Sequence, residues 1–195
     1  MSASSAVGGL VFCYLRTRDR KIAGMFGYYL GMSVYHFTLH AYRSWRPDHP
    51  RGYAKKGKGY LPPAPEEAKR YDGRAKQPPA LFNDDVQRLI LVFTLDICRT
   101  EGWNLEGTGS DPSHVHQMIS WRAFDTWERV DQRMKNLLAL KLNRHFSTPG
   151  KRWFVRRHSA PRRVKDREHY DHLLETYFPD HPGLFWKVGD PIPSV

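Results

Sequence analysis

The chain of 195 residues is 40% hydrophobic and 13% aromatic, which suits one ordinary hydrophobic core but is short for two independent domains. Lysine and arginine outnumber aspartate and glutamate by 31 to 20, and this excess suits a polyanionic partner or simply a basic surface. The two cysteines, Cys13 and Cys98, are too few for a disulfide framework, and no apolar run is long enough to span a bilayer. These features predict a cytoplasmic protein that is neither exported nor inserted into a membrane.

The first part of the chain shows no sustained periodicity, so we interpret residues 1–31 as an N-terminal extension to a single domain over residues 32–195. From Val34 to Trp45 the sequence is rich in aromatic and β-branched residues, which predicts the first core strand. Residues 46–81 are basic and rich in proline and glycine, which predicts a long loop with one helical turn near residues 66–71. Such a loop either contacts nucleic acid or is a mobile solvated insert.

A helix is predicted from Asn83 to Glu101, where Gly102 follows, because apolar residues recur at helical spacing between these points. Two strands follow over residues 104–109 and 114–121, joined by a turn that contains Asp111 and Pro112.

Asp125 and Glu128 resemble a capping box for a second helix, which ends before the turn at Pro149 and Gly150. Residues 152–158 predict another strand, and a third helix opens at Asp166 and runs through Phe178 to Pro179. The alternation of elements predicts an α+β fold: a ferredoxin-like or RRM-like antiparallel sheet with helices packed on one or both faces.

A His-x-His motif at His114 and His116 is the most suggestive local feature. Side chains two residues apart in a strand project from the same face, so both imidazoles would point in one direction. Neutral imidazoles in this arrangement can hold a divalent metal and leave positions open for water or a phosphate oxygen. The chain has ten histidines, so such a pair also arises by chance, and the motif is weak evidence when taken alone.

The predicted last helix carries a stripe of apolar and aromatic residues that includes Tyr170 and Tyr177. Periodicity alone indicates core residues. A tyrosine oxygen can nevertheless attack a phosphate if a metal polarises the scissile group.

Together, these segments resemble the HUH single-tyrosine transposases, of the insertion-sequence type and the REP-associated tyrosine type. Residues 110–116 (Ser-Asp-Pro-Ser-His-Val-His) resemble the turn and metal-binding motif of that superfamily, and residues 35–52 resemble its first strand and basic loop. The helix around Met134 resembles its second helix, and residues 175–183 fall where the family carries its nucleophile. The resemblance covers roughly residues 32–187, most of the domain.

This resemblance implies that Tyr177 is the nucleophile, with Tyr170 as a less favoured alternative, and that His114, His116 and His181 are ligands for Mg²⁺ or Mn²⁺. The chain departs from the family pattern at the third ligand, since the family more often has glutamine or asparagine four residues after the tyrosine. Imidazole is also a competent ligand. Pro179 interrupts the helix that normally presents both groups.

The activity implied is that of a metal-dependent single-stranded DNA endonuclease and strand transferase, acting in DNA transposition or recombination through a 5′-phosphotyrosine intermediate. Hairpin DNA with unpaired flanks would be the partner, and relatives act either as monomers or as homodimers. Trp45, Tyr53 or Trp153 could stack on bases. The basic residues that could contact the DNA backbone are Arg43, Arg46, Arg51, Lys55, Lys56, Lys58, Arg152, Arg156 and Arg157.

Two alternatives come from other classes of protein. A non-catalytic, domesticated DNA-binding protein that recognises hairpin repeats would keep the basic loop and tolerate the loss of Tyr177 or of the histidine pair, both of which are present. A small RNA-binding protein with an RRM-like sheet would show the same order of elements, but the predicted strands lack the aromatic pattern of that class.

Overall fold

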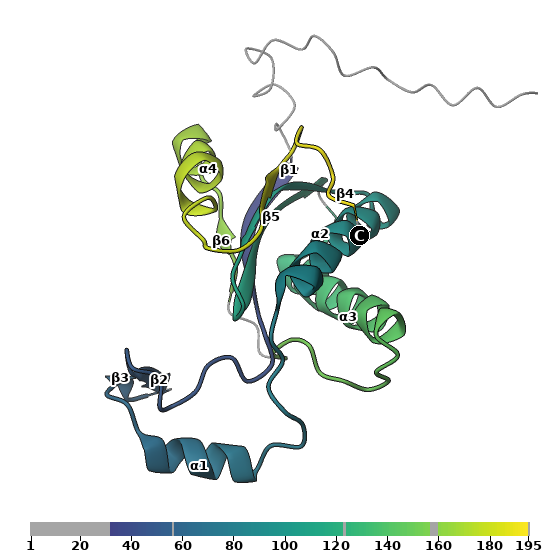
Figure 1. Ribbon diagram of the computed structural model, residues 1–195. Coiled ribbons are helices and arrows are strands. Elements are labelled where there is room, and N and C mark those ends of the chain that lie inside the picture. The colour runs from purple at the N-terminus through teal and green to yellow at the C-terminus, as the bar shows by residue number, and fades with distance from the viewer. Residues whose placement is uncertain (1–31, 56, 123, 157–159, 195) are drawn as a thin grey trace, which may run out of the picture. The chain divides into compact units, whose positions relative to one another are not determined.

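The computed structural model describes residues 32–55, 57–122, 124–156 and 160–194, so the predicted extension 1–31 lies outside the described residues. Its centre is a five-stranded antiparallel sheet with the strand order β6-β1-β5-β4-β7 (Figure 1). The strands are β1 (Met32–His40), β4 (Trp103–Ser110), β5 (His114–Arg122), β6 (Arg162–Arg163) and β7 (Phe185–Lys187).

Helices cover both faces of this sheet. On one face lie α2 (Asp84–Glu101) and α3 (Trp127–His145), and on the other lie α4 (Arg167–His172) and the π-helix η2 (Leu173–Tyr177) that continues it (Figure 1). The prediction of an α+β fold is therefore confirmed, and the arrangement is consistent with a ferredoxin-like sheet. Among the helices of the described chain, none is long and apolar enough to cross a membrane.

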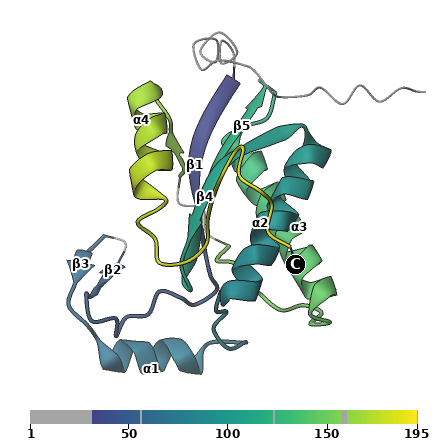
Figure 2. The same ribbon diagram turned by 45° about the horizontal axis from the view of Figure 1, so that its top comes forward.

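The segment predicted as a long loop has more structure than expected. It contains the hairpin β2 (Tyr53–Lys55) and β3 (Gly59–Leu61), followed by the helix α1 (Pro65–Gly73), and Figure 2 shows these elements apart from the main sheet. Proline at the first position of α1 is favourable because its missing N–H has no partner to lose there. The sequence showed the proline and glycine residues but not the pairing between two three-residue strands.

The caps of the helices follow the sequence closely, with one correction. Asn83 accepts a hydrogen bond from the N–H of Val86 at the start of α2, and Gly102 ends that helix in the left-handed conformation, with φ of 75°. At the start of α3 the cap is Thr126, not the predicted Asp125. Asp125 instead accepts a hydrogen bond of 3.0 Å from the indole of Trp103.

Two strand predictions were wrong in extent. The first strand ends at His40 rather than at Trp45, because the chain turns there and Arg43 adopts a φ of 62°. The strand predicted over residues 152–158 is reduced to a single bridge between Ala41 and Phe154, while residues 157–159 lie outside the described chain. The last helix begins at the predicted cap, Asp166, and changes to π-helix at Leu173.

A β-bulge in β4 changes which face its side chains occupy. Leu105 lies opposite Ile119 and is buried against α2 and α3, whereas Gly107 lies opposite Met118 because Glu106 is an extra residue in the strand. Side chains alternate between the two faces, so one inserted residue reverses the faces of all that follow. Gly107 and Gly109 therefore face α4 and η2.

These two glycines allow η2 to pack directly onto the backbone of β4. A Cβ atom at Gly109 would lie 2.6 Å from the carbonyl oxygen of Phe178, and one at Gly107 would lie 2.3 Å from a methyl carbon of Leu174. Both separations are shorter than van der Waals contact. The missing side chains thus determine how closely the segment that carries Tyr177 approaches the sheet.

We expect the substitution Gly109→Ala to destabilise the protein by about 1–3 kcal/mol, because the new methyl group displaces the backbone at Phe178. Urea unfolding would measure this loss. The matched control is Gly73→Ala at the end of α1, where a Cβ meets nothing within 4 Å and the change should be nearly neutral. Equal stability of the two variants would contradict the role assigned to Gly109.

Candidate metal centre

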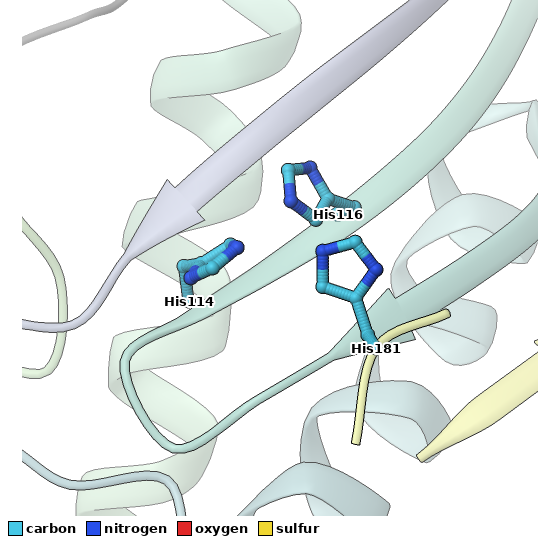
Figure 3. A group of neighbouring side chains, drawn as sticks. All are labelled: His114, His116 and His181. Carbon is cyan, nitrogen blue, oxygen red and sulfur yellow. The ribbon is translucent and has the colours of Figure 1, made fainter. Parts of the chain in front are cut away.

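Three imidazoles meet on the face of the sheet that α4 and η2 cover. His114 and His116 project from β5 as predicted, and His181 comes from the turn that follows η2 (Figure 3). One ligand nitrogen from each ring lies within 4.8 Å of the other two. The structure therefore brings together all three histidines that the sequence predicted as ligands.

The local turns hold two of these rings through their Nδ1 atoms. Nδ1 of His181 lies 2.8 Å from the carbonyl oxygen of Tyr177, to which only a protonated nitrogen can donate. Nδ1 of His114 lies 2.9 Å from Oγ of Ser113 and 3.1 Å from a carboxylate oxygen of Asp111. In both rings Nε2 remains available, and metal-binding histidines commonly use their other nitrogen for such outer contacts.

Asp111 organises the turn before β5. Its carboxylate accepts hydrogen bonds from the backbone N–H groups of Ser113, at 2.6 Å, and of His114, at 2.9 Å. Burial raises the pKa of this carboxyl group, but the hydrogen bonds from Ser113 and the proximity of His114 outweigh burial and hold the pKa below its ordinary value. The side chain therefore remains a carboxylate that can orient His114.

The third ring, His116, is held by a residue that the sequence analysis missed. Nδ1 of His116 lies 2.8 Å from Nε2 of His36 and 3.1 Å from Oγ1 of Thr38, both on β1. His40, also on β1, has its ring centroid 5.6 Å from that of His114. Alternation along a strand predicts that residues 36, 38 and 40 share one face. That this face adjoins the His-x-His pair follows only from the register of β1 with β5.

Burial keeps the imidazoles of His36, His114 and His116 neutral. It lowers the pKa of His116 to about 2, with further lowering by the neighbouring His114 and His36, and it lowers the pKa of His36 to about 4. Burial also lowers the pKa of His114, against the opposing effect of Asp111. Neutral imidazole is the form that binds metal ions, so His114 and His116 are in their binding-competent form near neutral pH.

Tyr177 lies beside the cluster, whereas Tyr170 does not. The hydroxyl oxygen of Tyr177 is 3.5 Å from Nε2 of His116, and the side chain is 36% exposed and so accessible to a substrate. Tyr170 is 7% exposed and donates a hydrogen bond of 3.0 Å to Glu106. Of the two tyrosines that the sequence left open, the geometry favours Tyr177.

Pro179 does not separate the tyrosine from His181. The π-helix closes with a hydrogen bond of 2.9 Å from the N–H of Phe178 to the carbonyl of Leu173, and the N–H of His181 then bonds to the carbonyl of Phe178 at 3.3 Å. This turn follows the end of the helix, which the sequence analysis placed at Pro179. The rings of Tyr177 and His181 are 5.1 Å apart between centroids.

The donor set fits a divalent transition metal. Three imidazole nitrogen ligands on one side leave further coordination positions open, which is typical of catalytic rather than structural sites. Imidazole suits transition metals, whereas Mg²⁺ prefers oxygen ligands and retains its water. Of the two ions expected from the sequence, Mn²⁺ accepts nitrogen ligands more readily than Mg²⁺ does, although both take oxygen ligands.

The predicted DNA-binding residues divide into several groups. Arg43 is 8% exposed and bonds to Asp72 and to the carbonyl of Gln77, so it stabilises the insert, residues 46–81. Arg46 pairs with Asp48 and Asp72, and Lys55 pairs with Glu67. The side chains of Arg51, Lys58 and Arg156 are exposed. The guanidinium of Arg152 lies 5.7 Å over the ring of Tyr42. Lys56 and Arg157 fall outside the described residues.

The predicted stacking residues also differ in exposure. Trp45 is 50% exposed, whereas Tyr53 and Trp153 are buried at 9% and 2%. Only Trp45 of these three presents a substantial ring surface to solvent. Tyr53 and Trp153 instead contribute to packing.

No protein-family profile, curated protein or solved structure matches the chain. The resemblance to HUH transposases therefore rests on the motif residues themselves.

We expect His116→Ala to weaken Mn²⁺ binding by more than about 100-fold, because loss of a ligand should exceed the 10–100-fold effect typical of outer contacts. Isothermal titration calorimetry of the purified protein measures this directly. His145→Ala is the matched control, since the ring of His145 at the end of α3 packs on Phe93 of α2 and should not affect the metal. Unchanged affinity in His116→Ala would exclude this cluster as the metal centre.

We expect His36→Phe to weaken the same binding by about 10–100-fold through loss of the hydrogen bond to Nδ1 of His116. His36→Gln retains an acceptor and should recover much of the affinity. Circular dichroism before titration would verify that both variants are folded. If phenylalanine and glutamine behaved alike, His36 would have only a packing role.

Proposed function

We propose that the protein is a metal-dependent single-stranded DNA endonuclease and strand transferase of the transposase type, acting through Tyr177. The observation that carries this proposal is the position of an accessible tyrosine hydroxyl 3.5 Å from one of three converging imidazoles. Attack of a tyrosine oxygen on a phosphodiester requires the negative charge of the phosphate to be offset, and a metal ion held by the three imidazoles would do so.

His114, His116 and His181 would hold Mn²⁺ or Mg²⁺, and the bound ion would polarise the scissile phosphate and offset the charge that builds on its oxygens. The hydroxyl oxygen of Tyr177 forms a bond to phosphorus as the bond from phosphorus to the 3′ oxygen breaks. Tyrosine loses its proton and the departing oxygen gains one. The products are a 5′-phosphotyrosine and a free 3′-hydroxyl, so one phosphodiester replaces another and no nucleotide triphosphate is consumed.

The rings around Tyr177 restrict its orientation before the substrate binds. Its ring meets those of His36 and His116 edge to face, with centroids 5.5 Å and 5.1 Å away. A nucleophile with few accessible rotamers loses less entropy on reaching the reactive geometry. The neighbouring rings thus contribute to alignment as well as to metal binding.

Hairpin DNA with unpaired flanks is the proposed partner, with Trp45 available to stack on a base. The free Cys98 thiol is buried, which is compatible with the proposed cytoplasmic location, and the acting form is a monomer or a homodimer. The cations proposed to contact the backbone are Arg46, Arg51, Lys55, Lys56, Lys58, Arg152, Arg156 and Arg157.

We expect the purified protein to form a denaturation-resistant adduct with labelled single-stranded hairpin DNA in the presence of Mn²⁺, detected as a shifted band on a denaturing gel. The DNA would come from the repeats flanking its own gene. Tyr177→Phe and His116→Ala should abolish the adduct, because each removes a group that the reaction requires. Tyr60→Phe is the matched control, since Tyr60 is 64% exposed on β3, away from the imidazoles.

Salt-sensitive binding with no adduct, across several hairpins and with both Mn²⁺ and Mg²⁺, would contradict the enzymatic proposal. It would favour the non-catalytic, domesticated DNA-binding protein. An adduct that survived Tyr177→Phe would show that a different residue is the nucleophile.

A further inference from the structure

A second basic region lies beside the candidate metal centre and includes none of the cations predicted from the sequence. It is a hollow of ≈ 660 Å³ between β6 and the first turns of α4. Arg162, Arg163 and Lys165 line it, and all three are exposed. None of the three has an ion-pair partner within the described chain, which distinguishes them from Arg43, Arg46 and Lys55.

Two carboxylates also line the hollow, so its charge must be compared residue by residue. Asp166 accepts a hydrogen bond of 2.8 Å from the N–H of His169 as the cap of α4. The other carboxylate is Glu168. Of the three permanent cations that line the hollow with two carboxylates, Arg162 shares the sheet face of His36, whereas Arg163 lies opposite Tyr35 and starts on the other face. One of the two carboxylates is committed to the helix, and the imidazoles of His169 and His172 complete the lining. The balance favours an anionic ligand.

The strand register connects this hollow to the site. Arg162 on β6 lies directly opposite His36 on β1, and directly opposed residues in antiparallel strands share a face, with Cβ atoms about 4.5–5.5 Å apart. His36 in turn bonds to His116, whose ring adjoins Tyr177. The hollow and the imidazoles thus occupy neighbouring parts of one sheet face.

We propose that the hollow formed by β6 and α4 binds backbone phosphates of the single-stranded DNA that flanks the scissile phosphate, with Arg162 nearest to the site of attack. This inference rests on the proposed function for the identity of the ligand. The planar guanidinium matches phosphate oxygens in a two-pronged geometry, and unpaired cations in a concave surface follow a polyanion better than scattered charges do. A strand bound there would continue along the same face to Tyr177.

The test measures binding separately from cleavage. In a Tyr177→Phe background, fluorescence anisotropy with a labelled hairpin and its unpaired flank gives affinity at several salt concentrations. We expect Arg162→Gln with Lys165→Gln to weaken binding at least about fivefold, and to reduce the salt slope by about 0.7 for each lost phosphate contact. The control, Arg88→Gln with Arg144→Gln, removes the same charge from α2 and α3 on the opposite face and should stay within about twofold.

Equal weakening of binding by the two double variants would overturn the proposal, since net charge alone would then explain the loss of affinity. Unchanged affinity in the variant that lacks Arg162 and Lys165 would also overturn it. Tighter binding of a fully paired duplex or of an RNA hairpin, with the same dependence on Arg162 and Lys165, would overturn single-stranded DNA as the ligand. Failure of the proposed function would give a different result from failure of this inference: the covalent adduct would be absent, while binding would still depend on Arg162 and Lys165. Thermal melting would verify that each variant is folded.

Discussion

The pairing of β1 with β5 is the constraint on which the candidate site depends. Nine residue pairs connect the two strands, and they place Thr38 opposite His116 and His40 opposite His114. Because side chains alternate with a period of two, a slip of one residue would turn the imidazoles of one strand toward α2 and α3. The buried residues Phe37 and Leu39 oppose such a slip, since it would move them from the core beneath α2 and α3 to the face that carries the imidazoles. The hydrophobic core thereby determines which histidines meet.

The second half of the site reaches the first through backbone contact. The bulge at Glu106 turns Gly107 and Gly109 toward η2, and their lack of side chains lets that segment approach the sheet closely. A π-turn contains one more residue than an α-turn, which rotates the chain that follows by about 100° relative to a regular helix. These two local irregularities act together, because one sets the distance of Tyr177 from β5 and the other affects its direction.

Local signals in the sequence predicted much of this arrangement. Alternation in β5 put His114 and His116 on one face, and the caps at Asn83, Gly102 and Asp166 marked helix boundaries correctly. Contacts between distant segments were not predictable in this way. The partnership of His36 with His116 depends on a register across 80 residues, and the bulge in β4 leaves no composition signal. The resemblance to the family motif identified His181. Periodicity alone would not have predicted that the turn after Pro179 brings this residue to β5.

The distribution of free charge gives a sharper criterion for a nucleic-acid surface than net charge does. Residues 43–55 are rich in cations, yet Arg43, Arg46 and Lys55 are all bound to carboxylates of the insert. A cation already paired must exchange one anion for another when it binds phosphate, so its net contribution is smaller than that of an unpaired one. Arg162 and Lys165 are unpaired, so they lose no existing ion pair when they bind phosphate. They also lie near the imidazoles on the same side of the sheet. The proposed binding charges and the proposed cleavage site would therefore lie along one path.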